Sequence, residues 1–288
     1  MSTVNNLQRV QLAFVGCGVM AEAIIAGLLK NQLVKPEQVV GSHPRQDRRE
    51  ELLVKYGIRM VEHNRDVVSS ERSATADDAS SIVFLTVKPQ RLGGILAELK
   101  GGLELGQLVV SIVAGARIDT LADDLQHRTI VRAMPNTPAQ IGQGMTVWTA
   151  TPEVTEGQRL QIQTVFGALG RELQVEEEKM IDMATALSAT GPTYTFLVME
   201  ALIDAGVHLG FSRHMAQELV LQTMLGSVLF ARESVKHPAE LRNMVTSPGG
   251  TSAEAIYQME KGTLRTVLSK AVWAAYRRAA TLGRKVDE

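Results

Sequence analysis

Between residues 10 and 150 the sequence alternates short β-rich runs with helical patterns, and this alternation limits the fold more than any other feature. A β-α-β succession forms a parallel sheet, because each helix returns the chain to the end of the sheet where the next strand begins. The predicted strands span residues 10–15, 39–41, 82–87, 108–113 and 130–132, with a later edge strand at 145–149 and a short one near 172–175. The predicted helices span 20–30, 46–56, 90–99, 118–125 and 156–169. We therefore expect a Rossmann-type α/β domain over residues 1–178.

The second half of the chain has a different character, because nothing after residue 179 resembles a strand. Long helices rich in Ala, Leu and Met are predicted at 180–206, 214–233 and 254–288. The segments 198–207 and 219–229 are apolar on more than one face, so each needs a partner on two sides. A compact bundle or a second subunit would supply it, and we favour the subunit because a bundle of this size would expose a large apolar patch. Residues 179–288 are thus predicted to be an all-helical dimerisation domain.

Charge and cysteine content exclude several classes of protein. The 288 residues carry 30 Lys+Arg against 31 Asp+Glu, a net charge of -1 that lacks the basic excess needed to bind nucleic-acid phosphates. The single cysteine, Cys17, cannot form an internal disulfide, and no Cys or His cluster has the spacing of a zinc site. No apolar stretch approaches the length of a membrane span, and the run at 10–15 is too short for a signal peptide. We expect a soluble cytoplasmic protein without a metal, a nucleic-acid partner or a membrane partner.

A glycine-rich loop follows the first predicted strand and opens a helix. It has the pattern Gly-x-Gly-x-x-Ala and consists of Gly16, Cys17, Gly18, Val19, Met20 and Ala21. In such a loop the first glycine permits a tight turn, the second lets a pyrophosphate approach the backbone, and the small last residue lets helix and strand pack closely. A tight strand–helix turn without a ligand has the same pattern. Its place after the first strand of a β-α-β unit favours dinucleotide binding by these six residues.

The residues at the end of the second predicted strand favour NADPH as the cofactor. An NAD-binding loop usually has an acidic residue about 20 positions further on, which binds the ribose 2'-hydroxyl. Here residues 40–45 read Val-Gly-Ser-His-Pro-Arg, without an acid. Ser42 can donate to a 2'-phosphate and the guanidinium of Arg45 can pair with it, so we expect NADPH, with NADH as the alternative. Arg48 and Arg49 are expected on a solvated helix face.

Ligands of an open α/β sheet bind beyond the carboxyl ends of its strands, so three further loops are candidates for the cofactor site. They follow later predicted strands, at residues 86–90, 111–115 and 132–138. In the last of them two prolines flank Asn136 and Thr137, which would make the loop rigid and present these side chains to the nicotinamide ring. A surface loop bounded by prolines is the alternative interpretation.

A second candidate anion site lies in the helical half, within residues 245–254. Gly249 and Gly250 lead into a helix, and Thr251 and Glu254 have the spacing of a capping box. The free backbone N–H groups at such a positive helix end suit a carboxylate. A capped helix start would explain the glycines, but it would not explain the dense hydroxyl groups. These belong to Thr246, Ser247, Thr251 and Ser252.

Several kinds of catalytic machinery are missing from the sequence. There is no Walker A loop, no nucleophile elbow, no His-Glu-x-x-His and no obvious acid–base dyad beside the glycine loop, and the six histidines are scattered. A hydride-transfer enzyme needs none of these, because the cofactor supplies the reactive atom and the protein supplies position and electrostatics. The pattern favours a dinucleotide-dependent oxidoreductase.

Taken together, these motifs resemble the Δ1-pyrroline-5-carboxylate reductase family, NAD(P)H-dependent enzymes of the last step of proline synthesis, over nearly the whole chain. The segments that carry the resemblance are 16–21, 87–90, 111–115, 132–138, 187–194 and 246–252. The last, Thr-Ser-Pro-Gly-Gly-Thr-Ser, is the most specific. The sequence departs from the family pattern at Val19, Ala189, Thr190 and Ser252, but none of these changes removes a hydroxyl or a glycine that the proposed anion site needs.

The resemblance implies which residues bind the ligands. Those implied to lie against the dinucleotide are Ser42, Asn64, Val87, Lys88 and Ala114, to which the same loops add Pro89, Gly115 and Asn136. The substrate carboxylate and ring nitrogen would lie against Ser247, Gly249, Gly250, Thr251 and Ser252, with Ser247, Thr251 and Ser252 as the catalytic candidates. The family also implies interlocked homodimers, often assembled into decamers, in which the dimer completes the substrate site.

Two other functions stay open at this point. One is an NADP-dependent reductase of another cyclic imine or of a hydroxyacid, and the other is a non-catalytic dinucleotide-binding regulator. A β-hydroxyacid dehydrogenase would carry a catalytic lysine in its interdomain helix, where this sequence offers only Lys179 at the start, which disfavours that enzyme. A fall in NADPH absorbance on addition of pyrroline-5-carboxylate would exclude the regulator.

Overall fold

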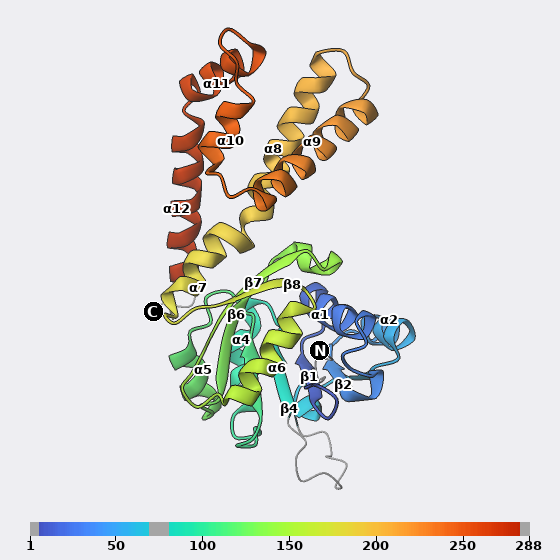
Figure 1. The fold of residues 1–288 in the computed structure, drawn as a ribbon. Coiled ribbons are helices and arrows are strands. Elements are labelled where there is room, and N and C mark those ends of the chain that lie inside the picture. Colours follow the sequence, from blue (N-terminus) through green and yellow to red (C-terminus); the bar gives the residue numbers. More distant parts are fainter. Residues whose placement is uncertain (1–5, 69–80, 283–288) are drawn as a thin grey trace. The chain divides into compact units, whose positions relative to one another are not determined.

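The computed structural model describes residues 6–68 and 81–282, and its main feature is one eight-stranded sheet (Figure 1). The strands are β1 (Gln11–Val15), β2 (Val39–Ser42), β3 (Arg59–Val61), β4 (Ser81–Leu85), β5 (Leu108–Ser111), β6 (Ile130–Met134), β7 (Gly144–Ala150) and β8 (Gly170–Gln174). Their order is β3-β2-β1-β4-β5-β6-β7-β8. Strands β1 to β6 are parallel, β7 is antiparallel to β6, and β8 is parallel to β7. The predicted Rossmann-type architecture is confirmed.

Helices cover both faces of this sheet. One face packs against α1 (Val19–Lys30), α2 (Gln46–Tyr56) and α6 (Glu156–Gly167). The other packs against α3 (Arg65–Val68), α4 (Leu92–Leu99) and α5 (Ile118–Leu125). Short 3-10 turns complete the connections at η1 (Pro36–Gln38), η2 (Pro89–Arg91) and η3 (Thr137–Ile141).

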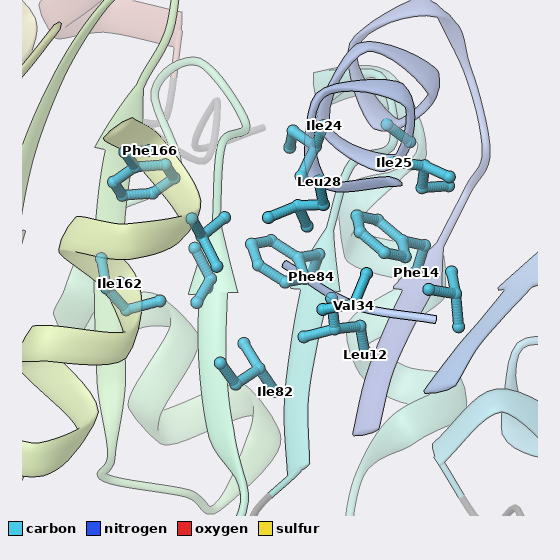
Figure 2. Close-up of a cluster of buried hydrophobic side chains, with 14 of the residues drawn as sticks. Leu12, Phe14, Ile24, Ile25, Leu28, Val34, Ile82, Phe84, Ile162 and Phe166 are labelled. Carbon is cyan, nitrogen blue, oxygen red and sulfur yellow. The ribbon is translucent and has the colours of Figure 1, made fainter. Parts of the chain in front are cut away.

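The core lies between the sheet and these helices, and the strands are apolar on both faces because both faces are covered. On the α1 side Phe14 and Phe84 stack with ring centroids 4.8 Å apart, in one cluster with Ile24 of α1 and Phe166 of α6 (Figure 2). Alternate residues of the same strands, such as Val83, enter the other cluster. Each such buried side chain contributes about 1.5–3 kcal/mol of transfer free energy. The core thus fixes the strand ends that carry the candidate cofactor loops.

Two features of the sheet differ from the prediction. The sequence pattern does not predict β3, because three residues are too few to show an alternation. The expectation that 145–149 forms an edge strand is wrong, since β7 lies between β6 and β8. At Gly170 (φ +139°) an added Cβ would collide with the backbone of Gly144, so only a glycine lets β8 begin this close to β7 and become the edge.

The chain forms two compact units and passes from one to the other between Thr190 and Gly191 and again after Ala274. The first unit includes α7 (Lys179–Ala184) and the π-helical turn η4 (Thr185–Ala189), because Ile181 packs with Met134 and Val147 of the sheet. The sequence-based boundary after residue 178 assigns these elements to the helical domain instead.

The second unit is entirely helical. It contains α8 (Gly191–His208), α9 (Arg213–Glu233), α10 (Pro238–Met244), α11 (Thr251–Lys261) and most of α12 (Leu264–Leu282). The prediction that 180–206 and 254–288 are each one continuous helix is wrong. The first is divided by η4, and the second is interrupted at Gly262 and Thr263, because Thr263 has a left-handed backbone (φ +56°).

Apolar side chains cover the outside of the second unit. Among residues 191–274, all of which the structure describes, the only buried residue is Ala216, which packs closely on Gly206. Large apolar side chains that are more than half exposed include Phe196, Leu197, Leu219, Leu225 and Phe230. This agrees with the prediction of helices that need further partners. In the described part of the chain no helix combines the length and the apolarity that crossing a membrane requires.

Candidate functional site

The glycine loop requires its first glycine for two reasons. Gly16 has a φ of +89°, which residues with a side chain rarely adopt, and a Cβ added there would lie 2.5 Å from Cγ1 of Val87. Val87, from the loop after β4, therefore lies directly against the glycine turn. Two of the predicted cofactor residues are brought together at this point.

Hydrogen bonds from both neighbouring strands fix the loop. The amide of Gly16 donates to Oγ of Ser42 (3.1 Å), and the amide of Cys17 donates to the Ser42 carbonyl (2.8 Å). From the other side, Oγ1 of Thr86 donates to the Gly16 carbonyl (2.7 Å). Sequence reasoning did not single out Thr86, although it directly follows a buried strand and so stands where a polar side chain can reach the loop.

The N-terminus of α1 is open at Gly18. This residue caps the helix in an extended conformation without a side-chain hydrogen bond, and an added Cβ would meet nothing within 4 Å. The first N–H groups of a helix have no partner within it and carry partial positive charge. An anionic group of a ligand can therefore approach Val19 to Ala21 over Gly18.

The expectation that Arg48 and Arg49 lie on a solvated face is wrong. The Arg48 side chain is only 12% exposed, pairs with Glu22 of α1 and with Glu51, and donates from Nε to the Cys17 carbonyl (3.4 Å). Arg49 is also largely covered. The two arginines are structural because they connect α2 to the glycine loop and to the end of β2.

Glu22 holds this arrangement together electrostatically. Its carboxylate accepts hydrogen bonds from Arg48, Lys55 and Tyr56. Burial by itself would raise the pKa of Glu22, but these hydrogen bonds outweigh it and lower the pKa to about 2. The ionised carboxylate neutralises Arg48, so that this guanidinium is not available to a ligand phosphate.

Cys17 is a packing residue. Burial raises the pKa of its thiol to about 12, so the thiol is neutral at physiological pH. Its Sγ occupies the place that a Cβ on Gly41 would enter. The side chain therefore faces β2, and only the backbone of Cys17 is left to face a dinucleotide.

At the end of β2, Ser42 does not have its predicted role, which is to donate to a 2'-phosphate. Ser42 is fully buried, and its hydroxyl donates to Oδ1 of Asn64 (2.7 Å) as well as accepting from Gly16. It therefore positions the loop instead of donating to a ligand. Arg49 donates to the carbonyls of His43 and Pro44.

Arg45 is the arginine at this strand end whose side chain stays in solvent. It is 67% exposed, and its nearest carboxylate, on Asp47, is 3.8 Å away and equally exposed. Such a contact holds the guanidinium only weakly. The guanidinium of Arg45 is therefore accessible to a ligand, and its pairing with a 2'-phosphate stays a prediction.

The remaining cofactor candidates lie at successive strand ends along the same edge of the sheet. Asn64 donates to Oε2 of Glu98 (2.7 Å) and so links the end of β3 to α4. Lys88 is exposed, and Pro89 begins the turn after β4. Ala114 and Gly115 (φ +77°) form the loop after β5. In a parallel sheet this edge is where a dinucleotide lies.

Asn136 differs from its predicted role. Its Oδ1 accepts from the amide of Met145 (2.9 Å), and its Nδ2 lies 3.3 Å from the carbonyl and 3.4 Å from the hydroxyl of Ser188. The expectation that this side chain faces the nicotinamide ring is not met, because its amide group forms hydrogen bonds with Met145 and Ser188 instead. Asn136 instead connects the loop after β6 with β7 and η4.

The hydroxyl-rich segment lies in the second unit, between α10 and α11. The predicted capping box is wrong, because the cap is Gly250 and no side chain caps the helix. Gly249 has a φ of +68°, and the amide of Gly250 donates to the Ser247 carbonyl (3.0 Å). The tight turn leaves the N–H groups of Thr251 and Ser252 at an uncapped helix end, which suits an anion.

Comparisons with known proteins cover both halves of the chain. A family model for pyrroline-5-carboxylate reductase dimerisation matches residues 178–282, and a model described as NADP oxidoreductase, coenzyme F420-dependent, matches residues 11–115. The pyrroline-5-carboxylate reductase of Synechocystis sp. is 40% identical over 276 residues, which are 96% of this chain and 99% of that protein. The enzyme of the same name from Pseudomonas aeruginosa is 38% identical over 279 residues, 96% of this chain and 98% of that protein.

Solved structures give the same result. A pyrroline-5-carboxylate reductase from Coxiella burnetii is 34% identical with a TM-score of 0.83, covering 96% of this chain and 100% of its own. Pyrroline carboxylate reductase from Plasmodium falciparum, solved with NADP bound, is 29% identical with a TM-score of 0.84, covering 96% of this chain and 99% of its own. The likeness thus extends over both compact units.

Proposed function

The chain belongs to the pyrroline-5-carboxylate reductase family, and we propose that it reduces Δ1-pyrroline-5-carboxylate to L-proline with NADPH. The observation that carries the proposal is a pair of uncapped helix N-termini, each entered through a glycine turn. That of α1 suits the pyrophosphate of a dinucleotide, and that of α11 suits the carboxylate of a small acid.

The residues around the glycine loop fit a nicotinamide dinucleotide. The open space over Gly18 leaves room for a pyrophosphate against the amides of Val19 to Ala21, and the hydrogen bonds from Ser42 and Thr86 hold that backbone in place before a ligand arrives. Val87, Lys88, Ala114 and Gly115 would continue the site along the strand ends. When bound, the reduced nicotinamide supplies the hydride.

NADPH is preferred over NADH in this proposal because of Arg45. Its guanidinium is exposed at the end of β2, where an acidic residue would mark NAD, and neither Arg48 nor Arg49 competes for the phosphate. A guanidinium pairs with a phosphate through two parallel hydrogen bonds. NADH lacks that phosphate and gains nothing from Arg45.

On the substrate side the chain has to bind and orient, and it needs no acid or base. A protonated imine is already electrophilic: its carbon accepts the hydride, and the electron pair of the C=N bond moves to the nitrogen, which keeps its proton. The amides of Gly250 to Ser252 would hold the carboxylate, with Ser247 and Thr251 beside it. The Ser252 hydroxyl would orient the ring nitrogen.

We further propose a homodimer, or a larger assembly such as a decamer, built on the second unit. Its support is the exposed apolar surface of α8 and α9 and the match of residues 178–282 to a dimerisation model. A cytoplasmic location is the matching expectation for a chain with one cysteine.

The test is to add pyrroline-5-carboxylate to the purified protein with NADPH. The expected result is a fall in NADPH absorbance with an equal amount of proline formed. Binding of NADPH without its oxidation would favour the regulator, and faster turnover of a six-membered cyclic imine acid would favour the other reductase. Either outcome would overturn the proposal.

A further inference from the structure

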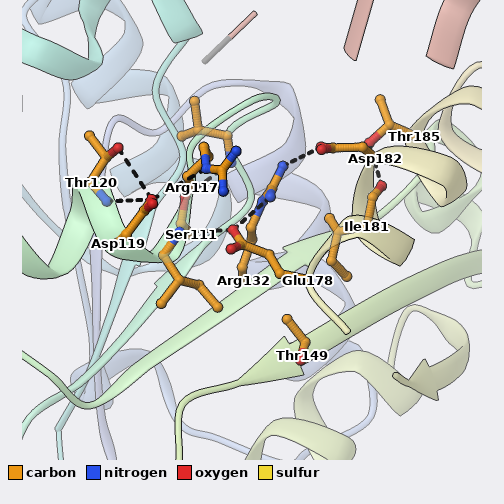
Figure 3. A network of polar contacts seen from close by, with 12 residues as sticks. Ser111, Arg117, Asp119, Thr120, Arg132, Thr149, Glu178, Ile181, Asp182 and Thr185 are labelled. Carbon is orange, nitrogen blue, oxygen red and sulfur yellow. Dashed lines mark hydrogen bonds and ion pairs between the residues drawn. The ribbon is translucent and has the colours of Figure 1, made fainter. Parts of the chain in front are cut away.

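Arg132 is the most deeply buried charged group in the described part of the chain, and it ends in two ion pairs. The side chain is 2% exposed, and its guanidinium donates to Oε1 of Glu178 (2.7 Å) and to Oδ1 of Asp182 (2.5 Å) (Figure 3). In the sheet it stands between Ser111 of β5 and Thr149 of β7, where the parallel strands give way to the antiparallel one. We call Arg132, Glu178 and Asp182 the triad.

Glu178 connects the triad to the residues that follow β5. The same Oε1 that pairs with Arg132 also accepts from the amide of Ile118 (2.8 Å), the first residue of α5. The residues that lead into α5 include Ala114 and Gly115, two of the proposed cofactor contacts. One carboxylate therefore ties the start of α5 to β6.

Through Asp182 the triad also binds the last segment of the first unit before the chain enters the second. Asp182 belongs to α7, which continues directly into η4. There Ser188 contacts Asn136, which follows β6. We call residues 178–190 the connector. Two residues that lie four positions apart on β6 and its loop, Arg132 and Asn136, bind it to the sheet through polar contacts.

A gain in stability does not explain why the charged triad is buried here. A buried ion pair loses its hydration, and apolar residues of the same shape often stabilise a fold as well or better. Arg132 Nε, moreover, is buried and has no hydrogen-bond partner, which costs further free energy. What the triad does provide is a fixed arrangement of three segments that meet at the carboxyl ends of β5 and β6.

We infer that Arg132 is a positioning residue for hydride transfer, acting through Glu178 and Asp182. The inference depends on the proposed function, in which the dinucleotide continues from the glycine loop along the strand ends to Ala114 and Gly115, and it places the nicotinamide ring beside them. The triad holds the Ala114 loop, the Asn136 loop and the connector in register, so that the ring is immobile when the imine approaches. The glycine loop and Arg45, which dominate NADPH affinity, lie outside it.

The test uses Glu178→Gln and Asp182→Asn in the full-length protein, because both keep the side-chain shape and remove the charge. Misplacing reacting groups by about 1 Å costs about 100-fold in rate, so we expect kcat to fall about tenfold to 100-fold while the dissociation constant of NADPH changes less than about twofold. The isotope effect on kcat with deuterated NADPH should rise, because hydride transfer becomes slower. Arg132→Lys, which can pair with one carboxylate, should keep more activity than Arg132→Met.

The matched control is Glu172→Gln. Glu172 is also half-buried and accepts a hydrogen bond, from Nε1 of Trp148, but it touches none of the three segments. Its removal should lower the melting temperature and leave kcat and the isotope effect unchanged. If the triad variants behave like this control, the triad is merely structural and the inference is wrong.

A second readout does not need turnover. The fluorescence anisotropy of the reduced nicotinamide in bound NADPH reports how firmly the ring is held, and it should fall in Glu178→Gln at unchanged affinity. If the unmodified protein does not oxidise NADPH with pyrroline-5-carboxylate, the proposed function fails, and this measurement still decides on the triad. Unchanged anisotropy in both triad variants would overturn the inference.

Discussion

Replacing Gly16 with alanine tests the geometry of the glycine loop. Two separate costs are expected, because the residue has a φ of +89° and its new Cβ would lie 2.5 Å from Cγ1 of Val87. A side chain at such a φ costs about 1–3 kcal/mol. Pushing Val87 off its rotamer costs about 0.5–1.5 kcal/mol more. Their sum is about 1.5–4.5 kcal/mol.

The assay separates the two costs with a second variant. Gly16→Ala should lower the free energy of unfolding in urea by about 1.5–4.5 kcal/mol. If the loop moves instead, the dissociation constant of NADPH should rise by the corresponding factor. Adding Val87→Ala removes the collision but not the strain, so the double variant should recover about 1 kcal/mol relative to the sum of the single variants. Val87→Ala alone is the control.

Two results would refute this reasoning. A Gly16→Ala protein within about 0.5 kcal/mol of the original in unfolding free energy, with unchanged NADPH affinity, would mean that the loop tolerates a side chain. Additive effects of the two substitutions would mean that Val87 is not the residue that excludes the Cβ.

Four further predictions concern single side chains. Arg45→Ala should raise KM for NADPH about tenfold or more and leave KM for NADH unchanged; equal changes for both would exclude the 2'-phosphate assignment. Ser252→Ala should lower kcat/KM about 5-fold to 150-fold with unchanged NADPH affinity, and Ser252→Thr should be near neutral; a change in melting temperature alone would mean a structural role. Cys17 should react with thiol reagents at pH 8 only after unfolding, since its pKa is about 12; rapid modification of the native protein would contradict its burial. Glu22 has a pKa of about 2 in the folded protein against an ordinary 4.5. Its contribution to the free energy of unfolding is therefore complete above pH 4.5 and is lost as the pH falls toward 2. If the unfolding free energy of Glu22→Gln fell as steeply with acid as that of the original protein, this prediction would be wrong.

Local patterns in the sequence predict the loop and the strands that frame it. Gly16 to Ala21 is predicted correctly as a turn, because its conformation depends on residues next to one another. The strands β1, β2, β4, β5 and β6 are predicted because each contains a continuous buried apolar run. A π-helical turn such as η4 has the same composition as an α-helix, so periodicity cannot find the interruption after Ala184.

Side-chain partners from distant parts of the chain account for the errors. Ser42 and Asn136 have the right chemistry to contact a cofactor, and the sequence gives no sign that Asn64 and Ser188 bind their side chains first. Arg48 looks like a surface arginine of an exposed helix until the fold places Glu22 against it. Roles that depend on one neighbour in space cannot be predicted from spacing along the chain.

The nearly coreless second unit has a consequence for how the protein comes to be active. With Ala216 as its only buried residue, this unit has too little internal burial to stay ordered alone, and in the proposed assembly it gains its interior from another chain. Folding of the second unit and dimerisation then occur in one step, and the rate of that step is second order in protein concentration. Activity recovered after dilution from denaturant should therefore return faster from a concentrated solution than from a dilute one, and newly made chains should stay inactive until a second copy is at hand.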